Sequence, residues 1–162
     1  EADETERIAE HVRETIRQVR ILVRGLCPVE PTADGLRRAL AGMCENVRDL
    51  FKTDCRFECS REISLSDRRA ATELYYIAQE AVNNALKHSG ARSISVVLAA
   101  SDHELLLNVS DNGKGLPAQS ERGHGMGLGV MDYRAKLIGA QLRVGPGQPG
   151  GTVVECRLPL SD

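Results

Sequence analysis

Aromatic side chains are scarce in this sequence, which has no tryptophan, two phenylalanines and three tyrosines among its 162 residues. The core must therefore consist of Leu, Val, Ile and Ala, and a platform of aromatic rings that stacks nucleic-acid bases is not expected. The net charge of −2 also lacks the positive excess that holds a protein on DNA or on an anionic membrane. We therefore expect an ordinary soluble globular protein without a nucleic-acid partner.

Long apolar runs are missing as well. No stretch approaches the roughly 18 to 20 apolar residues of a membrane-spanning helix, and the first residues lack the pattern of a signal peptide. We expect a cytoplasmic piece that makes no membrane contact, although a full-length protein could be tethered elsewhere. The length suits one domain with a proper core and a short additional element.

The cysteines lack the spacing of a zinc site and form no C-x-x-C pair. No pair of histidines or cysteines follows Cys55 and Cys59 at ligand spacing, so we expect no metal bound by cysteine. Scattered cysteines in a cytoplasmic protein behave as small apolar side chains, and we expect buried, reduced thiols. The five are Cys27, Cys44, Cys55, Cys59 and Cys156.

Residues 3–26 have apolar side chains at three- and four-residue intervals, which predicts an amphipathic helix with a narrow apolar stripe. The pattern ends at the proline-containing segment GLCPVEP. One helix cannot bury its own stripe, so we place a domain boundary here, with residues 1–30 before it and residues 31–162 after it.

The second part alternates helical and strand patterns. We expect a helix capped by Thr32, a long helix over residues 67–88 capped by Ser66 and ended by Gly90, and a helix from near Gly127. Strand patterns occur in CRFEC, SISVVLAA, ELLLNVS, QLRVG and TVVECRLP, with the second and third forming a hairpin. Helices grouped against an antiparallel or mixed sheet predict a two-layer α+β sandwich.

Polar side chains line one edge of the long helix. Glu80, Asn84 and Lys87 form a stripe roughly 120° from the centre of the apolar face, so the stripe borders the core. A solvated helix edge could have this pattern, but two adjacent asparagines cost helix propensity. Asn83 points away from the apolar face, so the helix geometry favours Asn84 as the asparagine with a functional role.

A glycine-rich region follows the hairpin. Asp-Asn-Gly signals a tight turn between strands, but the segment after DNGKG shows no strand alternation. The segment GHGMGLGVM precedes a helix, an arrangement that suits phosphate binding because bare backbone and free N–H groups can approach an anion. It matches neither the Walker pattern nor a dinucleotide fingerprint.

The order of these segments resembles the ATP-binding domain shared by sensor histidine kinases, type II topoisomerase ATPase subunits, the Hsp90 chaperone and MutL. EAVNNALKH looks like the N box, DNGKG and GHGMGLGVM like the two glycine boxes, and GGTVVECRLP like the final strand motif. With LVRGLCP, they are similar to histidine kinases of the nitrate- and nitrite-sensor type. The resemblance covers about residues 7–160 and implies a histidine kinase/Hsp90/gyrase-type sandwich preceded by one long helix.

The resemblance implies a role for each matching residue. Asp111 accepts a hydrogen bond from the adenine amino group, and Gly113 and Gly115 let the backbone pass close to the base. Glu80 orients or deprotonates the attacking nucleophile, and Asn84 is the ligand of Mg²⁺. The other implied nucleotide contacts are Lys87, His88, His124, Gly125, Gly127, Leu128 and Thr152. Ordinary β-propensity at a strand start explains Thr152 equally well.

The implied activity is transfer of the ATP γ-phosphate to a histidine of the homodimeric full-length protein, for relay to a response regulator. Residues 1–30 then correspond to the second helix of the dimerisation domain, and the acceptor histidine lies on a preceding helix outside this sequence. His11 is followed by Val12, unlike an acceptor, and we expect it at a surface or interface. A non-catalytic ATP-gated interaction module, an anti-sigma-type serine kinase and a plain structural domain stay open as alternatives.

Overall fold

The computed structural model describes residues 29–60, 63, 65–115 and 126–160, and the statements below concern these residues. The elements are α2 (Gly35–Phe51), β1 (Asp54–Cys59), α3 (Arg68–Asn84), the π-helical turn η1 (Ala85–Ser89), β2 (Ser93–Ala100), β3 (Glu104–Asp111), α4 (Met126–Leu137), β4 (Gln141–Pro146) and β5 (Thr152–Pro159). His11 and the predicted helix over residues 3–26 lie outside the described residues, and the domain boundary near residue 30 stays a prediction.

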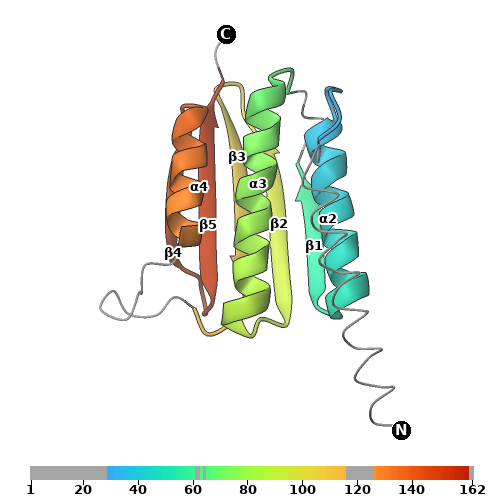
Figure 1. The fold of residues 1–162 in the computed structure, drawn as a ribbon, viewed down its shortest axis with the longest axis vertical. Helices are drawn as coiled ribbons and strands as arrows, with labels where there is room; N and C mark the ends of the chain where they lie inside the picture. The colour runs from blue at the N-terminus through green and yellow to red at the C-terminus, as the bar shows by residue number, and fades with distance from the viewer. Residues whose placement is uncertain (1–28, 61–62, 64, 116–125, 161–162) are drawn as a thin grey trace, which may run out of the picture.

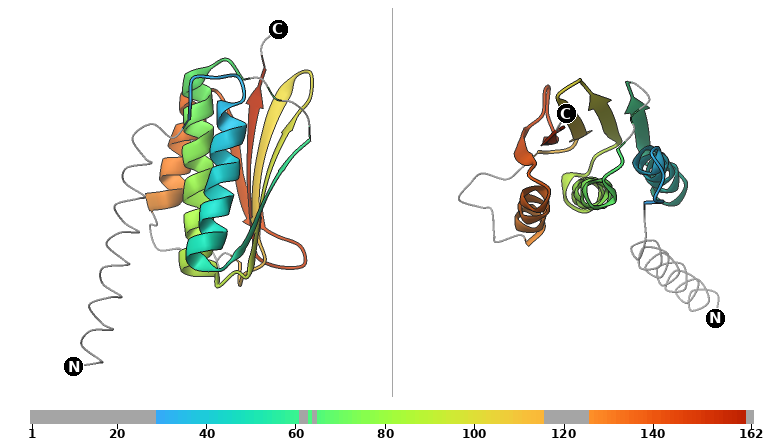
Figure 2. Two further views of the ribbon diagram at one scale, coloured as in Figure 1. Left: turned by 90° about the vertical axis from the view of Figure 1, so that its right-hand side faces the viewer. Right: turned by 90° about the horizontal axis from the view of Figure 1, so that it is seen from above.

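The strands form one five-stranded sheet in the order β1-β2-β3-β5-β4. β1 pairs with β2 in parallel, and the other neighbouring strands pair antiparallel, so the sheet is mixed. In Figures 1 and 2, α2, α3 and α4 lie side by side on one face of this sheet. The predicted two-layer α+β sandwich is therefore confirmed.

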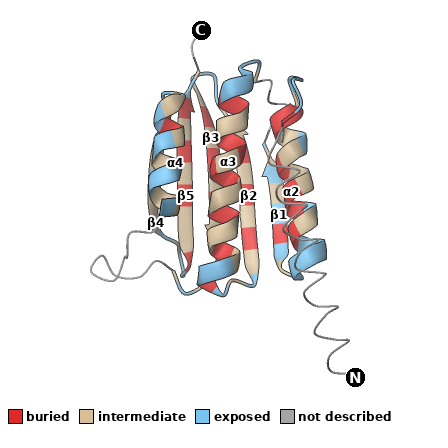
Figure 3. Cartoon of the chain, viewed as in Figure 1, coloured by how far each residue is buried: buried red, intermediate tan, exposed pale blue. Residues whose placement is uncertain are grey.

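The core lies between the helices and the sheet (Figure 3). Alternate residues of each central strand face the helices, as the period of two requires: Ile94, Val96 and Leu98 from β2 are fully buried. Leu74 and Ile77 of α3 are fully buried in the same core. Burial of each such side chain contributes about 1.5–3 kcal/mol, so a core of aliphatic residues suffices despite the scarcity of aromatics.

The predicted helix caps are wrong by one or two residues. The carboxylate of Asp67, in place of Ser66, caps α3 by accepting from the backbone N–H groups of Arg69 and Ala70 at 2.8 and 3.0 Å. Residue Asp34 precedes α2 in place of Thr32, without a side-chain capping bond. Gly90 ends the long helix in a left-handed conformation (φ 63°), as expected, but the last turn before it is widened into η1.

Four of the cysteines lie in described parts of the chain, and none of these four is in a disulfide. Cys44, Cys55 and Cys156 are buried and Cys59 is half-buried, while Cys27 lies outside the described residues. Burial raises the pKa of Cys156 to about 11, so this thiol stays protonated at neutral pH. Within the described part of the chain, no helix has the length and apolar character needed to cross a membrane.

Candidate functional site

Two predicted base-contacting residues lie at the ends of neighbouring strands. Ser110 of β3 pairs with Val153 of β5, so Asp111 and Thr152 are the next residues along the antiparallel ladder. Side chains alternate between the two faces of a sheet, which puts Asp111 on the face that carries buried Val109. The structure therefore brings Asp111 and Thr152 together on the helix-covered face of the sheet.

The Asp111 carboxylate is oriented by the turn that follows it. Its Oδ1 accepts a hydrogen bond from the backbone N–H of Gly113 over 2.8 Å. Among the described residues, the second oxygen Oδ2 has no hydrogen-bond partner. Asp111 is half-buried, so one oxygen is held by the protein while the other can accept a hydrogen bond from a ligand.

The glycines around Asp111 allow close approaches between protein segments. A Cβ at Gly151 would overlap the carbonyl oxygen of Asp111, and a Cβ at Gly113 would overlap Ser89. Gly115 has a positive φ of 78° and faces Gly151, whose φ is 83°. These positions require glycine for the fold of the turn itself. That Gly113 and Gly115 also leave room for a base stays a prediction.

The N-terminal turn of α4 lies against the polar stripe of α3. A Cβ at Gly127 would overlap Oε1 of Glu80 and would lie 3.4 Å from Nδ2 of Asn84. Glu80 and Asn84 are four residues apart, so their side chains lie on one face of the helix, and both are half-buried. Three of the predicted site residues are thus neighbours. Leu128 follows and is partly buried against the core.

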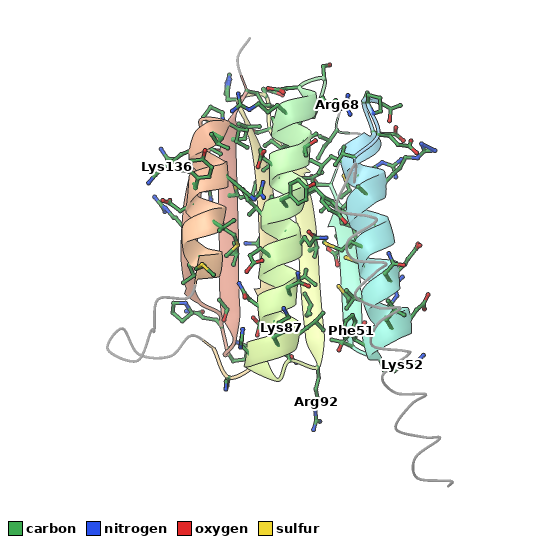
Figure 4. The ribbon with its side chains drawn as sticks, viewed as in Figure 1. Phe51, Lys52, Arg68, Lys87, Arg92 and Lys136 are labelled. Carbon is green, nitrogen blue, oxygen red and sulfur yellow. The ribbon has the colours of Figure 1, made fainter. Side chains whose placement is uncertain are left out.

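Lys87 and His88 lie in η1 and are exposed. Figure 4 shows Lys87 at the same end of the molecule as Lys52 and Arg92, so three positive side chains lie at the end at which β3 terminates. Positive side chains favour the binding of a polyanion such as a nucleoside triphosphate. Asn83 is half-buried like Asn84, so exposure does not separate the two asparagines. The predicted contacts His124 and Gly125 lie outside the described residues.

At the other end of the interface between α3 and α4, Arg134 holds the two helices together. Its guanidinium forms a 2.6 Å ion pair with Glu73 and lies 4.5 Å above the ring of Tyr76. Both partners of the ion pair are largely shielded, with 30% and 15% of their side-chain surfaces exposed. The sequence patterns do not reveal this contact, which fixes α4 on α3 and so keeps Gly127 near Glu80.

Comparison with known proteins gives consistent matches. Residues 69–162 match the family model described as histidine kinase-, DNA gyrase B-, and HSP90-like ATPase. The chain is 36% identical over 123 residues to the nitrate/nitrite sensor protein NarX of Escherichia coli K12, covering 76% of this chain and 21% of that protein. It is 30% identical over 155 residues to the sensor histidine kinase LiaS of Bacillus subtilis, covering 95% of this chain and 42% of LiaS. The chain thus spans less than half the length of these relatives.

Solved structures share the fold. The histidine kinase domain of the blue-light activated histidine kinase EL346 from Erythrobacter litoralis matches with a TM-score of 0.62 at 21% identity, covering 81% of this chain and 64% of that chain. The ATP binding domain of PrrB from Mycobacterium tuberculosis matches with a TM-score of 0.62 at 22% identity, covering 76% and 92%. At these identities the two structures show that the fold is shared, and they show nothing further.

Proposed function

The chain belongs to the histidine kinase-, DNA gyrase B- and HSP90-like ATPase family, and we propose that it is the ATP-binding catalytic domain of a sensor histidine kinase. In this role it transfers the γ-phosphate of ATP to a histidine of the homodimeric full-length protein, which passes it to a response regulator. The observation that carries the proposal is the packing at the C-terminal end of the long helix, where Gly127 lies against Glu80 and Asn84 and the turn after Asp111 lies against Ser89 of η1.

Recognition of adenine is assigned to Asp111. The Gly113 N–H engages Oδ1, and Oδ2 is left to accept from the exocyclic amino group of the base. A carboxylate selects a donor at this position, since a carbonyl oxygen on the base would meet it lone pair to lone pair. Thr152, the neighbour of Asp111 across the ladder, can add a hydroxyl contact.

Phosphate and metal binding is assigned to the polar stripe of α3. Mg²⁺ prefers oxygen ligands and usually takes one or two from the protein, with waters and phosphate oxygens completing its shell. The amide oxygen of Asn84 fits this requirement. Among the described residues, no group of three or more His, Cys, Asp or Glu side chains could hold a metal ion by itself. A Mg²⁺ ion bound by Asn84 would therefore take its other ligands from waters and phosphate oxygens. Bound there, Mg²⁺ would neutralise phosphate charge, Lys87 would add positive charge at the rim, and His88 would face the phosphates or the ribose.

Glu80 is assigned the catalytic role. It lies one helical turn before Asn84, close enough to the phosphate-binding side to accept a proton from, or to orient, an incoming imidazole. The imidazole nitrogen attacks the γ-phosphorus, the bond to the bridging oxygen breaks, and ADP leaves with the electron pair. This domain itself forms no covalent bond to the phosphoryl group, because it contributes to the transfer by positioning and charge stabilisation.

The test uses the chain, Mg-ATP and a separate fragment that carries an acceptor histidine. We expect calorimetry to detect ATP binding and the fragment to gain acid-labile, base-stable phosphohistidine. ATP binding without transfer to any histidine acceptor would point to a non-catalytic module. Transfer to serine would identify an anti-sigma-type kinase, and absence of ATP binding would leave a structural domain.

A further inference from the structure

The turn that carries Asp111 is fastened to the segment that joins η1 to β2. The backbone N–H of Lys114 donates to the carbonyl of Ser89 over 2.9 Å, and the N–H of Asn112 donates to the carbonyl of Ser93 over 3.2 Å. These bonds join the two segments on both sides of Gly113. The position of the Asp111 carboxylate therefore depends on the end of the long helix.

Ser89 forms the helix side of this junction and is buried, with 7% of its surface exposed. It lies in η1, and single π-helical turns of this kind often occur at functional sites. Its hydroxyl donates to the carbonyl of Ala85 over 2.7 Å and accepts from the N–H of Ala91 over 3.1 Å. Gly113 packs directly on Ser89, since a Cβ there would overlap the serine carbonyl and hydroxyl. Ser89 thus supplies the surface on which the Asp111 turn rests.

Asn112 forms the strand side of the junction. Its Oδ1 accepts hydrogen bonds from the backbone N–H groups of Arg92 and Ser93 over 3.0 and 2.9 Å. These two donors require an acceptor, which either an amide or a carboxylate oxygen provides. Removal of this side chain leaves both N–H groups without their protein partner, and only the backbone bond from Asn112 to the Ser93 carbonyl then remains on this side of the turn.

We propose that Ser89 and Asn112 are positioning residues for recognition of the adenine amino group, an inference that rests on the proposed function. They act through Gly113, whose N–H donates to Oδ1 of Asp111 and so directs Oδ2 toward the base. When either side chain is removed, the turn shifts and the carboxylate loses its orientation. The expected signature is a weaker preference for ATP over a purine triphosphate that lacks the 6-amino donor.

The experiment measures dissociation constants of Mg-ATP and Mg-inosine triphosphate for the chain and its variants. Inosine triphosphate carries an oxygen in place of the amino group and cannot donate to Asp111. We expect Asn112→Ala and Ser89→Ala to weaken ATP binding about tenfold and inosine triphosphate binding less than about twofold, as expected for one impaired hydrogen bond to a charged acceptor. Asn112→Asp keeps an acceptor and should restore ATP binding to within about threefold of the unaltered chain.

Ser101→Ala is the matched control. The Ser101 hydroxyl also supports a turn, accepting from the N–H of Glu104 over 3.1 Å, but at the opposite end of β2. It should leave both dissociation constants unchanged. Equal losses for the two nucleotides in Asn112→Ala, or failure of Asn112→Asp to restore ATP binding, would overturn the positioning role.

Amide hydrogen exchange on the unaltered chain gives a second test that holds even if a variant does not fold. Because coupling between two sites is reciprocal, ATP should slow exchange at Arg92 and Ser93 more than inosine triphosphate does at equal saturation. Equal protection by the two nucleotides would overturn the inference. A chain that binds neither nucleotide refutes the proposed function itself, which distinguishes the two failures.

Discussion

Gly151 offers the sharpest test of how the site is assembled. Its φ is 83°, and a Cβ at this position would overlap the carbonyl oxygen of Asp111, an atom of the β3 backbone that no rotamer change can move away. Gly139 is the matched control, because its φ is 70° but a Cβ there meets nothing within 4 Å. The two glycines share the backbone conformation and differ in the close approach.

The magnitudes follow from that difference. An L-residue in the left-handed region costs about 1–2 kcal/mol, so both Gly139→Ala and Gly151→Ala carry this cost. Gly151→Ala must in addition displace the Asp111 backbone, which adds about 1–3 kcal/mol if it resembles overpacking of a core. At about 2–4 °C per kcal/mol for a domain of this size, we expect midpoints about 4 °C lower for Gly139→Ala and about 10 °C lower for Gly151→Ala.

The assays are thermal unfolding followed by circular dichroism without nucleotide, and calorimetry with Mg-ATP at a temperature at which all variants are folded. Gly151→Ala should weaken ATP binding because Asp111 is displaced, whereas Gly139→Ala should bind ATP like the unaltered chain. Equal midpoints and equal affinities for the two variants would refute the contact between Gly151 and Asp111 as the reason for glycine at this position.

Three further substitutions test other parts of the site. Asp111→Asn should weaken ATP binding on the order of 100-fold in calorimetry, since the Gly113 N–H retains the amide oxygen and turns the NH₂ donor toward the donor of the base. Glu80→Gln should bind Mg-ATP normally yet lose transfer to an acceptor histidine fragment; normal transfer would remove Glu80 from catalysis. Arg134→Ala should lower the unfolding midpoint by about 3–8 °C, because it removes a shielded ion pair and a cation–π contact. As a control, Lys136→Ala removes an exposed ion pair and should change that midpoint by less than about 1 °C. Equal changes in midpoint for Arg134→Ala and Lys136→Ala would contradict the stabilising role of the Arg134 contacts.

The secondary structure was predictable from sequence where burial imposes a strict period. β2 and β3 alternate buried and half-buried residues over most of their length. The sequence shows the same alternation at one end of each strand, where Ser93, Ser95, Asn108 and Ser110 are the half-buried residues. The caps were less predictable, because Ser66 and Asp67 are adjacent and both residue types cap helices well. Only the fold shows that the Asp67 carboxylate reaches the free N–H groups.

The site residues were predictable in kind but their contacts were not. The spacing of Glu80 and Asn84 gives a shared helix face, since both lie on one element. The approach of Gly127 to that face depends on how α4 packs on α3, and the Arg134 contact that fixes this packing joins residues 61 positions apart. The widened turn η1 and the burial of Ser89 depend likewise on tertiary packing, which local propensity does not encode.

These contacts change how the glycine-rich motifs are interpreted. Gly113 contacts Ser89, Gly151 contacts the Asp111 carbonyl and Gly127 contacts Glu80. Each glycine therefore allows two segments of the site to pack closely together. If these glycines only left room for a nucleotide, replacing them would affect ligand binding and not the stability of the unliganded protein. Because an added Cβ would overlap protein atoms, we expect replacement to destabilise the unliganded fold as well. Loss of stability without nucleotide is therefore the result that separates the two explanations.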